Sequence, residues 1–524
     1  MLSLLEGIFA FAIWDRRKKE MFVARDGLGV KPLYYSLNEK GFSFSSEIKS
    51  LIKITPISPE LDLKSVENYI TYLWCPGKGT PFLNIKKLNP GSALIIKNGK
   101  IKRQWNWYTI PTKSSAKKIK NYKHILKETE IHLRKAIHKQ LISDVPIGAF
   151  LSGGLDSTSL VSFAKELAPN ISCFTIKTKG DAEKGVVDDL PYAKEAAKYL
   201  NVPLSIVEID SCKMAHDLED MIFQLDEPLA DPAPLNVLYI SKLAKKVGIK
   251  VLLSGTGGDD LFSGYRRHRA LSLEWYWKWL PLQVRQYFKR KSAFMTKDHP
   301  LQRRLSKLLS GASLTGDDSL IEYFRWTSRD DLLPLFSEQT REQILKNPPQ
   351  NIMHDYLNTL SSDLTQLEKM LALEKRFFLA DHNLIYTDKM SMAAGVEVRV
   401  PFLDPELIDF VSKIPDKYKV RLGQEKWILK KVMERYLPRN IIYRSKTGFG
   451  GPLRRWIKNE LNEMVNDTLS ERSLKKRNLF DGKKVSQLIK LNKEGRVDAS
   501  YTIFSLICIE IWCRKFLDEN HSFS

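Results

Sequence analysis

The sequence has little cysteine: only five of its 524 residues are cysteines, and no two of them form a C-x-x-C pair. Disulfide-stapled domains and Cys-rich zinc sites need more cysteines at closer spacing, so the composition argues against both. The nine histidines show no metal-ligand spacing either. We therefore expect a protein of the reducing cytoplasm that lacks a structural zinc site.

Long hydrophobic runs are also missing, since no stretch reaches the roughly eighteen apolar residues of a membrane-spanning helix. The strongest candidate, residues 503–512, contains Ser505 and Glu510 and is predicted to be a core helix. Residues 1–14 are apolar, but Glu6 interrupts them and the basic cluster comes after them. That order is wrong for a secretory signal, so we expect no membrane partner.

The sequence has fewer acidic than basic residues: it contains 83 Lys and Arg and 61 Asp and Glu, which gives a formal net charge of +22. This excess predicts affinity for polyanions, among them nucleotides, nucleic acid and anionic membrane surfaces, without choosing among them. Hydrophobic residues at 43% and charged residues at 27% exclude wholesale disorder and a fibrous chain. The length predicts two or three domains, and it leaves a homodimer open.

The first hundred residues are patterned as β-structure. Apolar residues 7–14 and 21–24 flank a charged turn, which is typical of a hairpin. An isolated hairpin is marginal in water, so further strands are expected, and the pattern up to about residue 107 is β-rich with one or two helices.

A polar, basic segment at residues 111–123 has no apolar face and predicts an exposed linker. We therefore divide the chain into a domain at 1–110, this linker and a second domain at 124–524. Helical spacing over 122–143 predicts that the second domain opens with a helix.

A glycine loop follows. Residues 145–151 are patterned as a buried strand, residues 152–157 read Ser-Gly-Gly-Leu-Asp-Ser, and helical spacing resumes at Thr158. Glycines let backbone N–H groups approach an anion closely, and the next helix offers its positive N-terminus, so a phosphate should dock there. The loop is not a Walker A motif, because no Gly-Lys-Ser/Thr follows it.

Alternating strands and helices continue beyond this loop. Residues 171–177, 203–209 and 250–254 are predicted strands, and residues 191–200 a helix. This alternation predicts an α/β fold whose parallel sheet binds its ligand at the carboxyl ends of the strands. A second loop, SGTGGDDLFSGY at 254–265, falls at such an end; it is not a dinucleotide fingerprint, because Asp stands at the third-glycine position.

Eight stretches of the chain match one family in order. GIFAFAIWD, ARDGLGVKPLYY and FSFSSEIKSL precede the linker; SGGLDS, the second loop, DKMSMAAGVEVRVPFLD and RSKTGFG follow it, with DEPLADPAPLN between the two loops. They resemble the glutamine-dependent asparagine synthetases, whose SGGLDS is a PP-loop ATP pyrophosphatase signature. The resemblance implies a partial, β-rich Ntn-type glutaminase domain, then a PP-loop α/β domain with a helical C-terminal part.

The resemblance also implies the reaction and its residues. ATP would be cleaved between its α and β phosphates, giving an adenylated carboxyl group and pyrophosphate. Lys446, in the KTGFG loop, would neutralise pyrophosphate as a catalytic residue. Asp156 and Asp259, one from each loop, would hold Mg²⁺, which prefers oxygen ligands. The implied ATP and pyrophosphate contacts are Leu151, Ser152, Gly153, Gly154, Asp156, Ser157, Ile176, Ser254 and Gly255.

One departure from the family concerns glutamine. The family nucleophile is a cysteine directly after the initiator Met, whereas this sequence starts Met1-Leu2-Ser3, which implies a truncation inside the domain. Asp26 matches a glutamine-contacting aspartate, but without a nucleophile it cannot hydrolyse an amide. By residue type alone, Asp26 is a turn aspartate before Gly27. We therefore expect a vestigial glutaminase half and dependence on free ammonia or a separate ammonia source.

A second departure is Thr256, where the family normally has Glu or Asp. A threonine hydroxyl cannot serve as a general base, although the neighbouring Asp260 is left as a partial substitute. The expected function is ATP-dependent synthesis of asparagine from aspartate and ammonia. Thr256 keeps another acceptor open, such as a uronic-acid sugar of a polysaccharide.

Two further alternatives belong to other classes. A non-catalytic remnant that binds a nucleotide is motivated by the missing nucleophile. An RNA-modifying PP-loop enzyme is motivated by the charge, but such enzymes typically need reactive cysteine pairs, which this chain lacks, so nucleic acid is not an expected partner.

Overall fold

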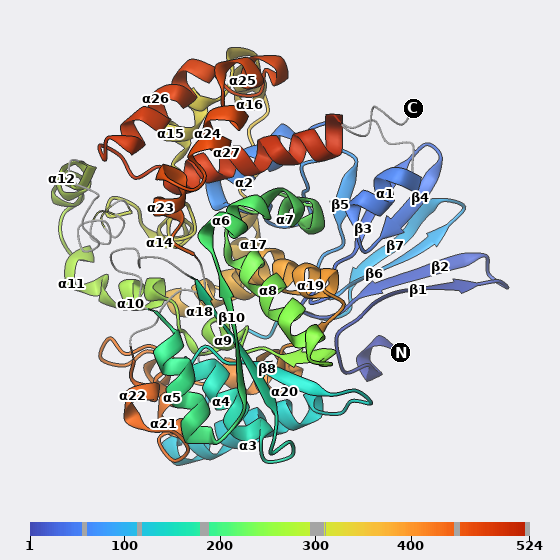
Figure 1. Cartoon of the computed structure of the whole chain (residues 1–524), viewed down its shortest axis with the longest axis vertical. Helices are drawn as coiled ribbons and strands as arrows, with labels where there is room; N and C mark the ends of the chain where they lie inside the picture. Colours follow the sequence, from blue (N-terminus) through green and yellow to red (C-terminus); the bar gives the residue numbers. More distant parts are fainter. Residues whose placement is uncertain are drawn as a thin grey trace.

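The computed structural model describes residues 1–54, 60–112, 118–178, 188–293, 306, 309, 311–444 and 451–518 (Figure 1). Two β regions and a large set of helices make up this part of the chain. Within it, no helix is both long and apolar enough to cross a membrane.

The N-terminal region contains two antiparallel sheets, which lie at the right of Figure 1. One has the order β1-β2-β6-β7 and the other the order β4-β3-β5. Their strands are β1 (Ala10–Asp15), β2 (Glu20–Arg25), β3 (Tyr34–Asn38), β4 (Gly41–Ser45), β5 (Ile85–Lys87), β6 (Ser92–Lys97) and β7 (Lys100–Asn106), with helices η1 (Leu2–Leu4), α1 (Ile48–Ile54) and α2 (Leu63–Tyr72). The predicted hairpin is confirmed, because β1 pairs with β2 from Ala10 opposite Arg25 to Asp15 opposite Glu20.

A small apolar core explains why this hairpin is stable. Val23 of β2 is fully buried and packs with Leu33 just before β3, Leu88 just after β5, and Leu94 and Ile96 of β6. β6 also pairs with β2 along its length and so supplies the neighbouring strand that the sequence pattern requires. The expectation of β-structure with one or two helices in this region is therefore confirmed.

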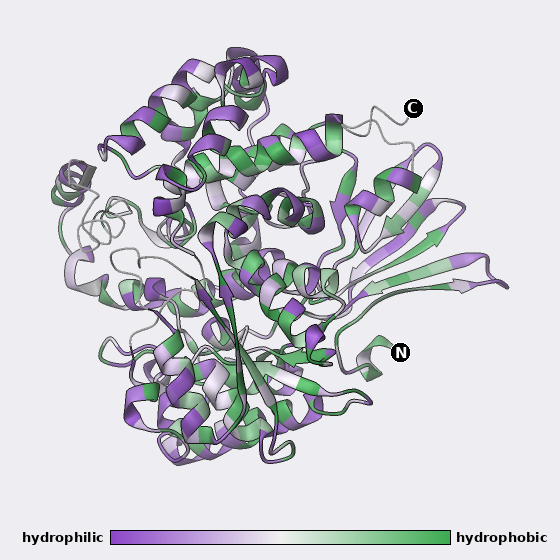
Figure 2. Cartoon of the chain, viewed as in Figure 1, coloured by the Kyte–Doolittle hydropathy of each residue, from purple (hydrophilic) through white to green (hydrophobic). Residues whose placement is uncertain are grey.

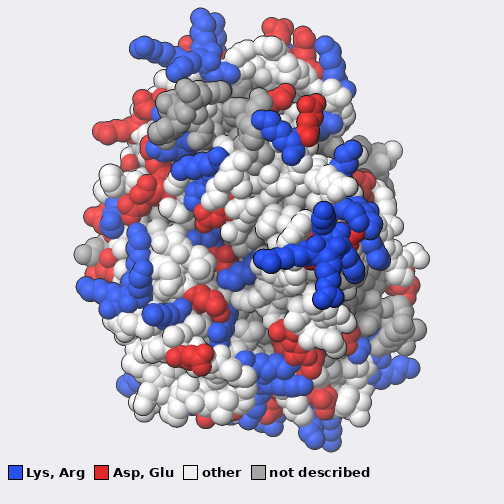
Figure 3. Space-filling view, turned by 90° about the vertical axis from the view of Figure 1, so that its right-hand side faces the viewer, with Lys and Arg blue, Asp and Glu red and all other residues white. Residues whose placement is uncertain are grey.

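Basic side chains gather on the face where these strands end. Figure 3 shows Lys and Arg clustered on the side that faces right in Figure 1. The β1–β2 and β6–β7 hairpins contribute the exposed residues Arg16, Arg17, Lys18, Lys19, Lys97, Lys100, Lys102 and Arg103. Glu20 pairs with both Lys97 and Lys102, so the cluster is partly neutralised.

The second β region is a five-stranded sheet with the order β10-β9-β8-β11-β12, in which every pair is parallel. The four predicted strands are confirmed as β8 (Ile147–Phe150), β9 (Ser172–Thr178), β10 (Leu204–Ile209) and β11 (Val251–Leu253). The fifth strand, β12 (Glu397–Arg399), was not predicted; it pairs with β11 from Val251 opposite Glu397. β8 and β11 are neighbours, so the loops that follow them lie at one edge of the sheet.

Helices cover both faces of this sheet. Apolar side chains of α8 and of the segment before β12 pack with Phe174 of β9 and Leu252 of β11 on one face. Ala149 and Leu253 pack on the opposite face with helices that include the predicted first helix of the domain. The helices concerned are α3 (Tyr122–Gln140), α4 (Leu155–Ala164), α5 (Leu190–Leu200), α8 (Ala233–Lys246), α19 (Leu384–Ala393), α20 (Pro405–Ser412) and α21 (Trp427–Met433).

Many of the remaining helices lie above the sheet in Figure 1, whereas α22 (Arg439–Ile442) lies at the lower left beside α5 and α21. The remaining helices are α6 (Ser211–His216), α7 (Leu218–Leu225), α9 (Gly258–Phe262), α10 (Arg266–Leu273), α11 (Trp275–Lys278), α12 (Leu282–Ala293), α14 (Gly316–Glu322), α15 (Arg329–Leu332), η3 (Leu333–Leu335), α16 (Glu338–Lys346), α17 (Ile352–Asn358), α18 (Gln366–Leu373), η4 (Glu374–Asn383), η5 (Pro401–Leu403), η6 (Asp416–Tyr418), α22, α23 (Leu453–Lys458), α24 (Asn462–Thr468), α25 (Glu471–Arg477), α26 (Gly482–Lys493), α27 (Ser500–Cys513) and η7 (Arg514–Asp518).

The apolar segment near the C-terminus is a core helix, as predicted. All residues of α27 except Tyr501 are buried, and Figure 2 shows that apolar residues dominate this helix. Tyr69 of α2 donates a hydrogen bond to the Ser505 carbonyl at 3.0 Å, so α27 also contacts the N-terminal region. The two regions therefore share one apolar core.

Candidate active site

The glycine loop is a tight turn between β8 and α4. Leu151 extends β8 by donating its N–H to the Phe174 carbonyl at 2.9 Å. The Ser152 and Ser157 hydroxyls lie 3.2 Å apart, and the Gly154 N–H points to Ser152 Oγ at 3.3 Å. The serines therefore fix the loop at the carboxyl end of β8, where the sequence predicted a phosphate site.

Glycine is required at the top of this loop. Gly153 has φ +68°, and a Cβ there would lie 2.3 Å from the Tyr192 carbonyl carbon. α4 starts at the next residue with Gly154 as N-cap, and no side chain caps it. The first N–H groups of a helix lack intrahelical partners and carry a partial positive charge, so this end can receive phosphate oxygens.

The second loop follows β11 and packs directly on the first. Ser254 extends the sheet, because its N–H donates to the Arg399 carbonyl at 2.8 Å. A Cβ on Gly258 would lie 2.7 Å from the Asp156 carboxyl carbon. The Thr256 hydroxyl lies 2.8 Å from Ser254 Oγ. Residue 256 thus presents a hydroxyl held by its neighbour in place of a carboxylate.

A lysine joins the two loops. The Lys426 ammonium pairs with Asp156 and lies 2.5 Å from Asp259 Oδ1. Burial opposes its charge, but Asp156 and Asp259 outweigh burial and raise the pKa of Lys426. The predicted magnesium ligands therefore converge on a single point, which their common cation marks.

The donor set at this point fits Mg²⁺. One or two carboxylates together with substrate phosphate oxygens make up its usual coordination, and Asp156 and Asp259 supply the carboxylates. No cluster of three or more metal-ligating side chains exists among the described residues. A magnesium ion bound here would thus take its remaining ligands from ATP and water.

An arginine brings a third segment to the glycine loop. Arg444 Nη1 donates to the Ser152 carbonyl at 3.3 Å, and the guanidinium also pairs with Asp189 and lies 4.3 Å from the Tyr192 ring centroid. Arg444 opens the RSKTGFG stretch. Lys446 lies outside the described residues, two positions further along the chain.

Comparisons with known proteins agree with this arrangement. Residues 128–514 match the asparagine synthase family, and residues 1–108 match a glutamine amidotransferase domain. Asparagine synthetase [glutamine-hydrolyzing] 1 of Bacillus subtilis is 31% identical over 518 residues, which cover 97% of this chain and 78% of that protein. The chain belongs to the asparagine synthase family.

Two other relatives of this chain carry names that describe different enzymes. A putative asparagine synthetase of Mycobacterium tuberculosis is 28% identical over 544 residues, covering 99% of this chain and 78% of that protein. Amidase chyE of Penicillium rubens is 25% identical over 514 residues, covering 92% of this chain and 75% of that protein. Membership of the family implies ATP as a substrate. The names of these relatives describe different reactions, since one is called a synthetase and the other an amidase.

Within the family frame, Asp26 has a clear local role. It is 1% exposed, and its carboxylate accepts hydrogen bonds from the backbone N–H groups of Leu28, Val30 and Lys31 at 2.9–3.2 Å. Burial raises its pKa, although backbone N–H groups, that of Lys31 foremost, and the charge of Arg25 oppose the shift. Asp26 therefore organises the turn, the role that its residue type predicts, and its contact with glutamine stays a prediction.

Three other motif residues can be placed. Ile176 lies on β9 opposite Val207 of β10 and is half-buried. Arg399 donates to Glu397 at 2.7 Å and to the carbonyls of Gln140 and Ile142 at the end of α3. The contacts of Glu397 and Arg399 are those of a structural pair.

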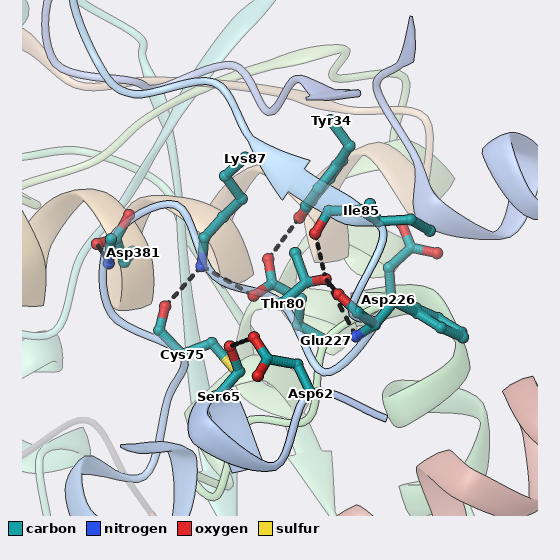
Figure 4. A network of polar contacts seen from close by, with 12 residues as sticks. Tyr34, Asp62, Ser65, Cys75, Thr80, Ile85, Lys87, Asp226, Glu227 and Asp381 are labelled. Carbon is teal, nitrogen blue, oxygen red and sulfur yellow. Dashed lines mark hydrogen bonds and ion pairs between the residues drawn. The ribbon is translucent and has the colours of Figure 1, made fainter. Parts of the chain in front are cut away.

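The DEP segment links the two regions of the chain. Glu227 accepts hydrogen bonds from Tyr34 and Lys87, both at 2.8 Å, and Lys87 also donates to the Cys75 carbonyl at 2.5 Å (Figure 4). Asp226 accepts from the backbone N–H groups of Ile48 and Lys49 at 3.1 Å, which caps α1. The segment is thus a buried junction between the two regions.

Sequence reasoning missed Lys426 and Arg444. Arg444 stood inside a recognised motif, so its position beside Lys446 was a usable signal. Lys426 gave none, because its contact with Asp156 spans 270 positions and its backbone has φ +54°, which is uncommon for lysine.

Proposed function

We propose that this chain uses ATP to convert a carboxylate into an amide through an acyl-AMP, with aspartate as acceptor and asparagine as product. The observation that carries the proposal is the meeting of two loops, from the adjacent strands β8 and β11, at Lys426 and beside the open N-terminus of α4. In open parallel sheets ligands bind at this edge. We divide the chain at the linker 111–123, and the gap between the family matches, from 108 to 128, supports that division.

In the first step, a carboxylate oxygen attacks the α-phosphorus of ATP and the α–β phosphoanhydride bond breaks. The glycine loop and α4 hold the phosphates, while Lys426 and Lys446 balance the charge that develops on pyrophosphate. Mg²⁺ held by Asp156 and Asp259 would offset phosphate charge when bound. In the second step, ammonia attacks the acyl carbon, loses a proton and displaces AMP.

We propose ammonia itself as the nitrogen donor of this 524-residue chain. The first cysteine in the sequence is Cys75, which is 3% exposed, and burial raises the pKa of its thiol well above the ordinary range. A thiol that is buried and protonated cannot attack glutamine. Ammonium should therefore support amide formation and glutamine should not.

A second candidate for the carboxylate that is amidated also has support. Thr256 is bonded to Ser254 and carries no charge, and Asp260 is 1% exposed and accepts from the Tyr265 hydroxyl at 3.1 Å. Neither residue offers an exposed base for the ammonia proton. A different carboxylate, such as a uronic acid, is therefore kept as the alternative acceptor.

Exchange of labelled pyrophosphate into ATP tests the proposal, because it requires a reversible first step. We expect exchange that depends on aspartate, and amide formation with ammonium as sole nitrogen donor. Exchange that depends on glucuronate but not on aspartate would show that the uronic acid, and not aspartate, is the acceptor. Stoichiometric amide from glutamine alone would overturn the ammonia proposal, and ATP binding without exchange over a panel of carboxylates would overturn the enzymatic one.

A further inference from the structure

Exposed apolar side chains are concentrated in one short part of the chain. Of the 25 large hydrophobic side chains that are exposed in the described residues, six lie between positions 276 and 288, in α11, in α12 and in the turn between them. Such a concentration on the surface marks an interaction site. We name it the α11–α12 surface; its members, 37–75% exposed, are Tyr276, Trp279, Leu282, Val284, Tyr287 and Phe288.

α12 carries an apolar stripe that is exposed to solvent. Val284, Tyr287 and Phe288 stand at i, i+3 and i+4, the spacing that places side chains on one side of a helix. The centroids of the Tyr287 and Phe288 rings lie 6.1 Å apart. Among the described side chains of α12, Arg285 is the only buried one, and its guanidinium donates to the Ala312 carbonyl at 3.1 Å. The helix is therefore anchored at Arg285 and leaves its stripe uncovered.

Trp279, in the turn before α12, is suited to an apolar environment. Its side chain is 75% exposed, yet its Nε1 donates to the Tyr276 carbonyl at 2.8 Å. An indole whose N–H is already satisfied can enter an apolar layer without leaving a donor unpaired. Trp279 precedes Leu282 by three positions, so their Cα atoms are at most about 11 Å apart and both side chains can meet one surface.

The charges of this segment have one sign. Residues 275–291 contain five Lys and Arg and no Asp or Glu. Three of the five, Lys289, Arg290 and Lys291, follow the stripe on α12 and are exposed. The Lys291 ammonium lies 5.7 Å from the centroid of the Tyr287 ring, so the basic group borders the stripe directly. A partner for this surface must therefore be apolar and anionic at once.

The face of an anionic lipid bilayer has both properties. Helices that lie on a membrane carry Trp, Phe and Leu on one side and Lys and Arg beside them. α11 and α12 lie at the left edge of the molecule in Figure 1, opposite the basic hairpins, where a flat surface can approach them. Single-stranded nucleic acid fits less well, because the aliphatic Leu282 and Val284 have no ring on which a base can stack. A second copy of this chain would bring like charges together.

We propose that the α11–α12 surface binds the face of an anionic lipid bilayer, with Trp279 and the stripe of α12 in the apolar layer and residues 289–291 at the headgroups. The expectation of no membrane partner was based on spanning segments and signal peptides, and a helix that lies on the surface needs neither. The proposal does not depend on the amidation reaction, because it uses none of the residues of the two loops.

Sedimentation of the full chain with lipid vesicles tests the proposal. The vesicles contain phosphatidylcholine alone or an equal mixture of phosphatidylcholine and phosphatidylglycerol. We expect binding to the mixed vesicles that weakens as sodium chloride is added, and little binding to phosphatidylcholine alone, because the basic group needs an anionic surface. No binding to the mixed vesicles, or equal binding to both kinds, would overturn the proposal.

Matched variants separate this surface from the basic hairpins, which could also attract an anionic bilayer. Trp279→Ser/Lys291→Met should lower the affinity for mixed vesicles by at least about tenfold, since one apolar anchor and one cation are lost. Trp14→Ser/Lys18→Met removes the same exposed residue types from the β1–β2 hairpin and should stay within a few-fold of the wild type. Urea denaturation should give both variants the wild-type midpoint, because all four side chains are exposed. The opposite order of affinities would assign the bilayer to the hairpins.

Insertion of Trp279 gives a second readout. Brominated acyl chains quench the fluorescence of a tryptophan that they touch, so mixed vesicles of brominated lipid should quench part of the wild-type emission. Trp279→Phe should lose most of this quenching and Trp14→Phe should keep it; equal quenching in the wild type and Trp279→Phe would contradict insertion. Binding of a single-stranded oligonucleotide that Trp279→Ser/Lys291→Met abolishes, without any binding to vesicles, would assign the surface to nucleic acid instead.

Discussion

Two buried lysines, Lys87 and Lys426, each join segments that are far apart in the sequence, yet their surroundings differ. Lys87 lies in a closed network in which Glu227 accepts from both Lys87 and Tyr34 (Figure 4). Burial lowers the pKa of Lys87, but the charges of Glu227 and Asp381 outweigh burial and raise it. Lys426 instead lies at the carboxyl edge of a parallel sheet, beside an uncapped helix.

The difference shows that a buried ion pair is not by itself a functional site. The carboxylates that face Lys426 have side chains that are 16% and 20% exposed, whereas Glu227 is 7% exposed. Solvent and phosphate can therefore reach the Lys426 site, while the Lys87 network is filled by protein groups. We expect changes at Lys87 to affect stability and changes at Lys426 to affect catalysis.

Lys87→Met should produce the largest effect. It leaves the Glu227 carboxylate buried without its cation, and breaking a buried pair typically costs about 3–5 kcal/mol of unfolding free energy. Urea denaturation measures the loss. The double variant Lys87→Met/Glu227→Gln should recover much of it, because the second change removes the stranded charge; no recovery would argue against a closed, charge-balanced network.

Lys426→Met should reduce the rate of the reaction more than the stability of the fold. Loss of one preorganised stabilising group commonly lowers a rate by about 100- to 1,000-fold, and we expect that fall in ATP–pyrophosphate exchange. Lys431→Met, on the same helix α21 but paired with Glu434, is the matched control and should keep exchange within a few-fold. Equal exchange rates for the two variants would remove Lys426 from the site.

Gly153→Ala comes next, at about 2 kcal/mol of unfolding free energy, since a strained backbone conformation typically costs about 1–3 kcal/mol. The alanine would have to adopt a φ of +68°, and its Cβ would also lie 2.3 Å from the Tyr192 backbone. Gly248→Ala has a similar φ, +86°, but nothing lies within 4 Å of its Cβ. The difference between the two variants therefore measures the close approach alone, and identical losses would contradict it.

The glycine loop could be predicted because its signals are local. An apolar run, two glycines and helical spacing from Thr158 lie within about twenty residues, and the structure places β8, the loop and α4 accordingly, although α4 starts at Leu155. β12 could not be predicted, because three residues carry no periodicity and only their register with β11 makes them a strand.

The buried lysines and their partners could not be predicted from the sequence for a related reason. Lys87 and Lys426 do not differ from surface lysines in their local sequence, and their partners Glu227 and Asp156 are 140 and 270 positions away. The family motifs identified the carboxylates at Asp156 and Asp259 but not the cation between them. The distinction between a closed and an open network is a property of packing, which no local pattern encodes.

Lys369→Met extends the comparison to a pair that is neither closed nor catalytic. Lys369 of α18 lies 2.9 Å from Asp317 of α14, and the two side chains are 16% and 21% exposed. Partly solvated pairs of this kind contribute only about 0.2–1 kcal/mol, because water screens the attraction and both side chains lose rotamer freedom. We therefore expect a loss of that size in urea denaturation and no change in exchange. A loss as large as that of Lys87→Met would mean that neither burial of the partner carboxylate nor closure of the network sets the cost, because the Asp317 side chain is more exposed than that of Glu227.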